Sequence, residues 1–355
     1  MKILITGVCG FVGSALAKHL RENIEGLEIF GLDNLMRPGA ETNRREIEHW
    51  GVRFVHADLR AASDLEDLPA CDWVIDAAAN PSVLAGLTGD GASRRLFEHN
   101  LAALGNVLEY CRRHHAGLLL LSSSRVYSIP ALASIPLKVE DASFVIDPAT
   151  ALPAGLSSRG IGEDFSTTAP VSLYGATKLA SEIVALEYGA AFDFPVWVTR
   201  CGVLAGAGQF GTPAQGIFSF WLNAHLRRRP MRYTGFNGHG HQARDAFHPR
   251  DLGALLIAQM RSGRKSGQRV YTAGGGVENT MSLAQLTRWC DSRFGTHAPA
   301  CDPAERAYDI PWVAMDSTAA ERDFGWRVET PLARILEEIA IHAEAHPDWL
   351  EVSRA

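Results

Sequence analysis

The chain lacks the features that would place it in a membrane or in an oxidising compartment. Its six cysteines, Cys9 and Cys201 among them, are scattered without the CxxC spacing of redox or zinc motifs. No run approaches the ~18 apolar residues that a membrane-spanning helix needs. Glycines interrupt the apolar N-terminus, which has no cleavage-site pattern after it. We therefore expect reduced, mostly buried thiols in a cytoplasmic protein.

The sequence also lacks an excess of positive charge. Its net charge is −6 and its pI is near 6.1, so no basic surface for nucleic acid or for an anionic membrane is indicated. His239 and His241 have no carboxylate or cysteine nearby at ligand spacing, and we interpret them as part of a loop rather than a metal site. Apolar residues, by contrast, make up 46% of the 355 residues. That content suffices for one large domain or two closely joined ones.

The first apolar run, residues 2–6, leads into a glycine-rich turn that opens a helix. In this turn Gly7 allows a tight bend, Gly10 leaves room for a phosphate, and Gly13 lets the helix pack closely on the strand. The N-terminus of the helix presents free N–H groups and a partial positive charge to an anion. An ordinary strand–turn–helix is the alternative. The context favours a dinucleotide site that includes Phe11 and Val12.

Strands and helices alternate through the first half of the chain. A second strand, residues 27–32, ends at Asp33, where an acid is placed to bind the ribose hydroxyls of a dinucleotide. Apolar strands that alternate with amphipathic helices are typical of a parallel sheet covered on both faces. The sequence therefore predicts a doubly wound α/β fold. Further strands are expected at residues 52–56, 73–77, 118–121, 196–200 and 270–272, and helices at 93–114, 174–189, 218–226, 249–260, 282–294 and 331–346.

Residues 128–172 break this alternation. They are rich in proline, alanine, serine and glycine and have no clear period, so we expect a loop that borders the active site. Residues 227–229 are three arginines at the end of a predicted helix, where cations are favourable.

Tyr174 and Lys178 stand four residues apart on one face of a predicted helix. A lysine ammonium beside a phenol and an oxidised nicotinamide lowers the pKa of the tyrosine toward neutrality. Tyr174 is then a candidate base for a carbinol proton. A chance surface pair is the alternative.

These motifs together resemble the extended short-chain dehydrogenase/reductase family that acts on nucleotide sugars. The resemblance covers nearly the whole chain and implies a Rossmann fold, NAD as cofactor and a nucleotide-diphosphate sugar as substrate. It also implies a homodimer formed by helices 93–114 and 174–189. It divides the chain into an NAD-binding domain of residues 1–200 plus about 246–272, and a smaller substrate-binding domain of about 201–245 plus 273–355.

The resemblance also assigns roles to single residues. It implies that Ser123, with Ser124 as an adjacent candidate, relays protons together with Tyr174 and Lys178. The implied cofactor-binding residues are Gly7, Gly10, Phe11, Val12, Gly13, Asp33, Asn34, Asp58, Leu59, Ala77, Ala78, Ala79, Asn100, Tyr174, Lys178 and Arg200. The implied substrate-binding residues are Ser124, Gln209, Thr212, Gln215, Arg244 and Arg306, with no metal ligand among them.

Departures from the family pattern narrow the reaction. The 4,6-dehydratases place an acid pair after the relay hydroxyl, and uronate decarboxylases have a glutamate where Arg125 stands. Val203 replaces a common asparagine. Residues 33–43 and 208–216 resemble the CDP-paratose 2-epimerase branch. We therefore expect an NAD-dependent epimerase that acts at C2 of a CDP-sugar. A 4-epimerase or a reductase is the alternative, and a dinucleotide-sensing protein without chemistry is a distant third.

Overall fold

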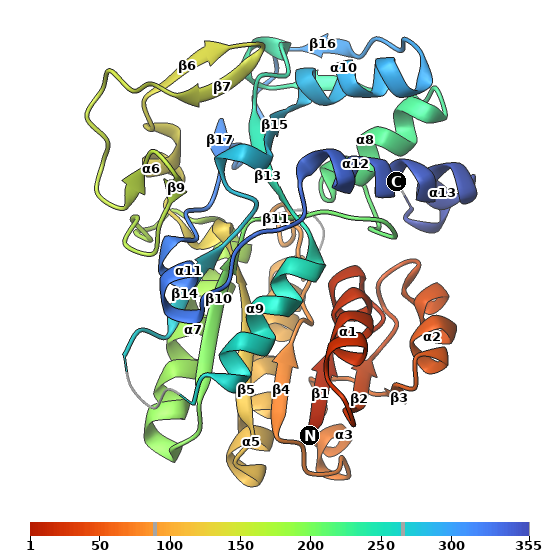
Figure 1. The fold of residues 1–355 in the computed structure, drawn as a ribbon, viewed down its shortest axis with the longest axis vertical. Helices are drawn as coiled ribbons and strands as arrows, with labels where there is room; N and C mark the ends of the chain where they lie inside the picture. Colours follow the sequence, from red (N-terminus) through yellow and green to blue (C-terminus); the bar gives the residue numbers. More distant parts are fainter. Residues whose placement is uncertain (88–90, 264–266, 355) are drawn as a thin grey trace.

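The computed structural model of the chain describes residues 1–87, 91–263 and 267–354. Its centre is a parallel sheet of seven strands in the order β14-β10-β5-β4-β1-β2-β3 (Figure 1). The order reverses at β1, which pairs with both β2 and β4, and at such a switch point the carboxyl ends of the strands leave a crevice. The predicted doubly wound fold is confirmed. The strands are β1 (Lys2–Thr6), β2 (Glu28–Asp33), β3 (Arg53–His56), β4 (Trp73–Asp76), β5 (Gly117–Ser123), β10 (Val196–Cys201) and β14 (Val270–Ala273).

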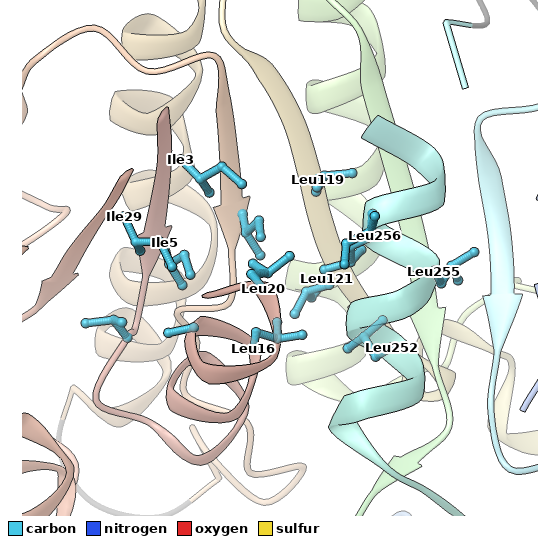
Figure 2. Close-up of a cluster of buried hydrophobic side chains, with 14 of the residues drawn as sticks. Ile3, Ile5, Leu16, Leu20, Ile29, Leu119, Leu121, Leu252, Leu255 and Leu256 are labelled. Atoms are coloured by element: carbon cyan, nitrogen blue, oxygen red, sulfur yellow. The ribbon is translucent and has the colours of Figure 1, made fainter. Parts of the chain in front are cut away.

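The side chains of these strands alternate between two hydrophobic cores. On one face, Ile3 and Ile5 of β1 share a core with α1 (Phe11–Asn23) and α9 (Pro249–Arg261). Figure 2 shows these two isoleucines together with leucines of both helices. On the other face, Leu4 packs with α5 (Ala103–His114) and α7 (Ser172–Phe192). Because both faces are covered, the strands read as continuous apolar runs.

The remaining helices of this half are short. A turn of π-helix, η1 (Glu98–Ala102), joins α4 (Ala92–Phe97) to α5, so the predicted helix 93–114 is present but locally widened. The others are α2 (Ala40–His49), α3 (Ser63–Glu66) and the 3-10 turn η2 (Ser124–Val126), which follows β5 directly.

A second group of elements lies beyond the carboxyl ends of the large sheet, in the upper part of Figure 1, and we call it the capping elements. It contains a small sheet of β11 (Val203–Leu204), β13 (Ala243–Phe247), β15 (Thr280–Ser282) and β17 (Trp312–Val313). A pair of short strands, β12 (Arg232–Thr234) and β16 (Ala300–Asp302), lies alongside. Its helices are α8 (Ile217–Leu226), α10 (Leu283–Phe294), α12 (Leu332–Ala345) and α13 (Trp349–Val352), whereas α11 (Thr318–Phe324) packs beside β14 and α9.

Residues 128–172 are folded, so the prediction of a loop that borders the site was wrong. They form α6 (Ile129–Ala133), the hairpin β6 (Leu137–Glu140) and β7 (Ser143–Ile146), and the small hairpin β8 (Leu156–Ser157) and β9 (Gly160–Ile161). The turn residue Asp141 bonds to Arg288 at 2.9 Å and to Gln285 at 3.2 Å on α10. The apolar side chains of the segment share a core with residues 310–315. Since the segment lies before β10 in sequence but packs on the capping elements, the two-domain division stays a prediction.

The three arginines at residues 227–229 directly follow the C-terminus of α8, as predicted, and two of them also bond to the C-termini of neighbouring helices. Arg227 donates hydrogen bonds to the carbonyls of Ala343, His346 and Pro347, at the end of α12. Arg228 donates to three carbonyls that end α10. In the described ranges, no helix combines the length and apolar character of a bilayer-spanning segment.

Candidate active site

A cavity of about 360 Å³ lies between the carboxyl ends of the large sheet and the capping elements. The glycine turn lines one end of it, and residues 122–125 with Tyr174 line its middle. The far end is lined by residues from 201–218, 242–244, 281–286 and 306–309. One continuous space therefore joins the predicted cofactor turn to the predicted substrate residues.

The glycine turn has the shape that a diphosphate requires. Gly7 has a φ of 63°, and a Cβ there would lie 2.8 Å from the Cα of Ala78. A Cβ on Gly13 would lie 2.2 Å from the carbonyl oxygen of Gly7, so a side chain would push α1 away from the turn. Phe11, Val12 and Gly13 line the cavity in the first turn of α1, where backbone N–H groups have no partner within the helix. These residues fit the diphosphate of NAD.

Two acids predicted to bind the cofactor, Asp33 and Asp58, lie at the end of β2 and shortly after β3. Asp33 is buried and accepts hydrogen bonds from the N–H groups of Cys9 (3.0 Å) and Leu35 (2.8 Å). Burial raises the pKa of the Asp33 carboxyl. Asn34 donates to Asp58 at 3.2 Å, so these two predicted residues are brought together. Leu59 and Ala78 do not line the cavity, since Leu59 is buried in the core and Ala78 packs under the glycine turn.

Arg37 and Arg44 follow β2 and would favour NADP if they faced the adenosine ribose, but both have other partners. Arg37 donates to the carbonyl oxygen of Phe210 and to Oε1 of Gln215, each at 2.9 Å. Arg44 pairs with Glu48 at 3.0 Å. Among the described residues, neither arginine forms a hydrogen bond or an ion pair with Asp33.

Ser123 and Tyr174 form the predicted proton-transfer pair. Both side chains line the cavity, and the nearby hydroxyl of Ser123 acts to lower the pKa of Tyr174. The Oγ of Ser123 accepts a hydrogen bond from the N–H of Arg125 at 3.1 Å. The close approach of η2 to α7 depends on Gly175, because a Cβ there would lie 2.2 Å from the carbonyl oxygen of Arg125. Ser124 is buried and lines the same cavity.

The surroundings of Tyr174 act on the pKa of its phenol in both directions. Burial raises the pKa of its phenol, while the hydroxyl of Ser123 and the charge of Arg125 act in the opposite direction. Lys178 is itself buried, which lowers the pKa of its ammonium, while the carboxylates of Asp76 and Glu182 act in the opposite direction.

Asn100 does not line the cavity but supports a segment that does. Its side chain bonds to the N–H (2.8 Å) and the carbonyl (3.1 Å) of Asn80 and to the hydroxyl of Thr177 (3.3 Å). It thereby holds the segment after β4, from which Ala77 and Ala79 line the cavity.

Arg200 does not point into the cavity, which corrects its assignment to the cofactor. Its guanidinium bonds to both carboxylate oxygens of Glu182 and to the carbonyl of Glu163 at 3.0 Å. The reason is the alternation along β10. Cys201 lines the cavity, while Arg200 faces α7.

Five of the six predicted substrate residues line the cavity, and Thr212 does not. The backbone of Thr212 pairs with that of Gln215 instead. Gln209 donates to the carbonyl of Leu204 at 2.6 Å, and its Oε1 has no partner among the described residues. Arg244 pairs with Asp309 at 3.3 Å, and Arg306 donates to the carbonyl of Pro213 at 3.2 Å.

Residues 3–274 match the family described as the NAD dependent epimerase/dehydratase family. The chain belongs to this family. It is thus an enzyme, and NAD is the cofactor of its family.

Relatives named for different reactions have similar sequence identity to this chain. The CDP-paratose 2-epimerase of Salmonella typhi is 27% identical over 323 residues, which cover 87% of this chain and 90% of that protein. The dTDP-glucose 4,6-dehydratase of Streptomyces antibioticus is 28% identical over 365 residues, 100% of this chain and 94% of the other. The crystal structure of the UDP-glucuronic acid 4-epimerase from Bacillus cereus, in complex with UDP-glucuronic acid and NAD, has a TM-score of 0.75 at 20% identity, covering 97% of this chain and 99% of that one. This likeness shows a shared fold.

Two residues at the substrate end escaped the sequence analysis as site candidates. Gln242 is 7% exposed and lines the cavity. Its Nε2 donates to the carbonyl of Thr234 at 3.2 Å, and its Oε1 has no partner in the described part of the chain. The sequence could have indicated Gln242 as a site residue, because it lies two residues before Arg244 and alternate residues of an extended segment face the same side. Arg125, the second, was noted only as a departure. Among the described residues, no three His, Cys, Asp or Glu side chains gather as in a metal site.

Proposed function

We propose that the chain is a nucleotide-sugar epimerase that retains its NAD and inverts C2 of a CDP-sugar. The observation that carries this proposal is that Ser123 and Tyr174 line one cavity, which runs from the glycine turn to Arg244 and Arg306. The name of the Salmonella typhi relative supports the 2-epimerase reading.

The surroundings of Ser123 argue against dehydration. A 4,6-dehydratase removes water from the sugar and needs an acid and a base beside the relay hydroxyl. Here Ser124 and Arg125 occupy those positions, and Asp309, an acid among the described residues that line the cavity, is paired with Arg244. This donor set supports reversible oxidation without elimination.

In the proposed mechanism Tyr174 removes the proton of the sugar hydroxyl and later returns it, with Ser123 as the relay. The chemistry that NAD supplies when bound is reversible acceptance of a hydride. Lys178 would hold the nicotinamide ribose, and Asp33 would hold the adenosine ribose. Arg244 and Arg306 hold the diphosphate through charge-assisted hydrogen bonds, while Gln209 and Gln215 bind the sugar weakly enough for the ketone to turn between its two faces.

The test is a panel of CDP-, UDP- and dTDP-sugars incubated with the protein in ordinary and deuterated water, with products read by NMR. The proposal predicts a C2 epimer without solvent deuterium on carbon, because the hydride is retained. Substrate deuterated at C2 should then give a primary isotope effect. An isotope effect from the C4 label and none from C2 would replace the proposal with a 4-epimerase, and a net reduced product would indicate a reductase.

A further inference from the structure

Arg125 is a cation in the middle of the cavity that the proposed mechanism leaves without a role. It follows Ser124 directly and lines the cavity together with Tyr174. Its backbone touches α7 at Gly175, next to the catalytic tyrosine. In the described part of the chain its guanidinium donates one hydrogen bond, to the carbonyl oxygen of Tyr308 at 3.1 Å. A guanidinium has five N–H donors, so most of its hydrogen-bonding capacity is open to a ligand.

The segment 306–310 brings Arg125 together with the arginines proposed for the diphosphate. Tyr308 accepts from Arg125, and the next two residues, Asp309 and Ile310, accept from Arg244 at 3.3 and 2.7 Å. Arg306 belongs to the same segment. Arg244 pairs with the carboxylate of Asp309, and Arg125 and Arg306 lie near enough to act electrostatically on this pair. Three guanidinium groups and one carboxylate thus leave an excess of two positive charges. Burial and the charge of Arg244 lower the pKa of Arg125 to about 10, so it stays cationic at neutral pH.

The position of this cation bears on which sugar carbon reacts. In a nucleotide sugar the β-phosphate is attached through oxygen to C1, so C2 is the next carbon, whereas C4 lies across the ring. A guanidinium that reaches both the surroundings of Tyr174 and the diphosphate arginines can contact the β-phosphate when C2 faces the tyrosine. With C4 at the tyrosine, the phosphate lies on the far side of the ring from Arg125.

We propose that Arg125 binds the β-phosphate of the substrate and thereby holds C2, rather than C4, of the sugar against Tyr174. This inference rests on the proposed function and adds a residue that determines specificity. Its anion could also be a carboxylate on the sugar itself, and the experiment separates these two sources.

The test uses NAD-loaded protein and calorimetric titration with CDP, UDP, CMP and UMP, because the diphosphates carry a β-phosphate and the monophosphates do not. Arg125→Gln keeps a donor for the carbonyl of Tyr308 but removes the charge, and Arg125→Lys keeps the charge. The glutamine variant should bind the diphosphate about 10- to 100-fold more weakly. Its affinity for the monophosphate should stay within about twofold of that of the wild type, and the lysine variant should recover most of the loss. Arg327→Gln, at a side chain that is 79% exposed, is the control and should bind both ligands normally.

Each other result overturns the inference in a distinct way. Normal diphosphate binding by Arg125→Gln would show that the arginine only holds Tyr308 in place and does not bind the phosphate. Equal losses for diphosphate and monophosphate would indicate a disturbed loop. A loss confined to nucleotide-linked uronates, measured in parallel with their neutral counterparts, would assign Arg125 to a sugar carboxylate. If the wild type binds none of these nucleotides, the proposed function itself fails.

Discussion

At the scale of single residues, Tyr174 is the most direct test of proton transfer. Tyr174→Phe removes the phenolic hydroxyl and keeps the ring that lines the cavity. Turnover should fall about 10²- to 10⁴-fold, because a positioned acid–base group contributes that much, while nucleotide-sugar affinity should stay nearly unchanged. Lys178→Met should lower both turnover and NAD affinity. Steady-state kinetics and calorimetry check these outcomes, and near-normal turnover in the phenylalanine variant would exclude the mechanism.

Asp33 sets the expected choice between the two nicotinamide cofactors. Its carboxylate lies at the end of β2 and should repel the additional phosphate of NADP. Arg37 and Arg44, which could have offset that repulsion, bond to Gln215 and Glu48 instead. We expect NAD to co-purify, since an epimerase must retain its hydride. Mass spectrometry of the cofactor released from the protein checks this, and a predominantly phosphorylated species would contradict it.

Residue roles could be predicted where local spacing determines them. Gly7 to Gly13 and the pair Tyr174–Lys178 each lie within one turn or helix, so the sequence alone indicated their geometry. Arg125 could not be assigned in this way, because its partner Tyr308 lies 183 residues away. The orientation of Arg200 on β10 depends on its ion pair with Glu182, which lies on another element, α7. Contacts of this kind are absent from local sequence patterns.

At the scale of elements, the strands and helices of the large sheet were predictable because apolar runs and amphipathic periods encode burial directly. Residues 128–172 were not, since their order comes from distant partners. Asp141 bonds to α10, and a Cβ on Gly160 would lie 2.5 Å from the carbonyl oxygen of Ala314. Such a segment has no period of its own, although it is well packed.

The junction of α9 and α12 supplies a prediction about pH. His248, at the start of α9, accepts from the N–H of Arg250 through Nδ1, so its Nε2 carries the proton and donates to Glu338 of α12 at 3.1 Å. This bond, with the nearby Arg334 and Arg250, lowers the pKa of the Glu338 carboxyl to about 2. A carboxyl whose pKa is lower in the folded than in the unfolded protein stabilises the folded state at any pH above its unfolded-state pKa. This stabilisation is lost as the pH falls toward its folded-state pKa.

Glu338→Gln should therefore lower the free energy of unfolding at pH 7 by about 1–2 kcal/mol, after allowance for solvent screening. The difference from the wild type should shrink as pH falls from about 4.5 toward 2. Urea unfolding across this range measures it. Glu344→Gln on the same helix is the control, because its ion pair with Arg293 is more exposed and should contribute less than about 1 kcal/mol. A difference that does not vary with pH would contradict the assignment.

At the scale of the whole molecule, one face of the large sheet carries exposed apolar side chains on its outer helices. Leu173, Ile183, Val184 and Phe192 of α7 and Phe97 of α4 are each more than a third exposed. Both helices belong to the pair for which the sequence predicts a homodimer. Apolar groups gathered on one face are typical of a self-association surface, so the homodimer remains our prediction.

A matched pair of variants tests whether this face forms the dimer. Ile183 on α7 is 58% exposed and Ile341 on α12 is 56% exposed, so a glutamate at either position disturbs the core little. A charge at Ile183 would be buried without a partner in a dimer formed through α7, which is costly, whereas Ile341 lies on a helix outside that surface. Light scattering at micromolar concentration should give the mass of two chains for the wild type and for Ile341→Glu, and of one chain for Ile183→Glu. A wild-type mass of one chain would refute the dimer, and an Ile183→Glu protein that stays dimeric would move the interface to another face.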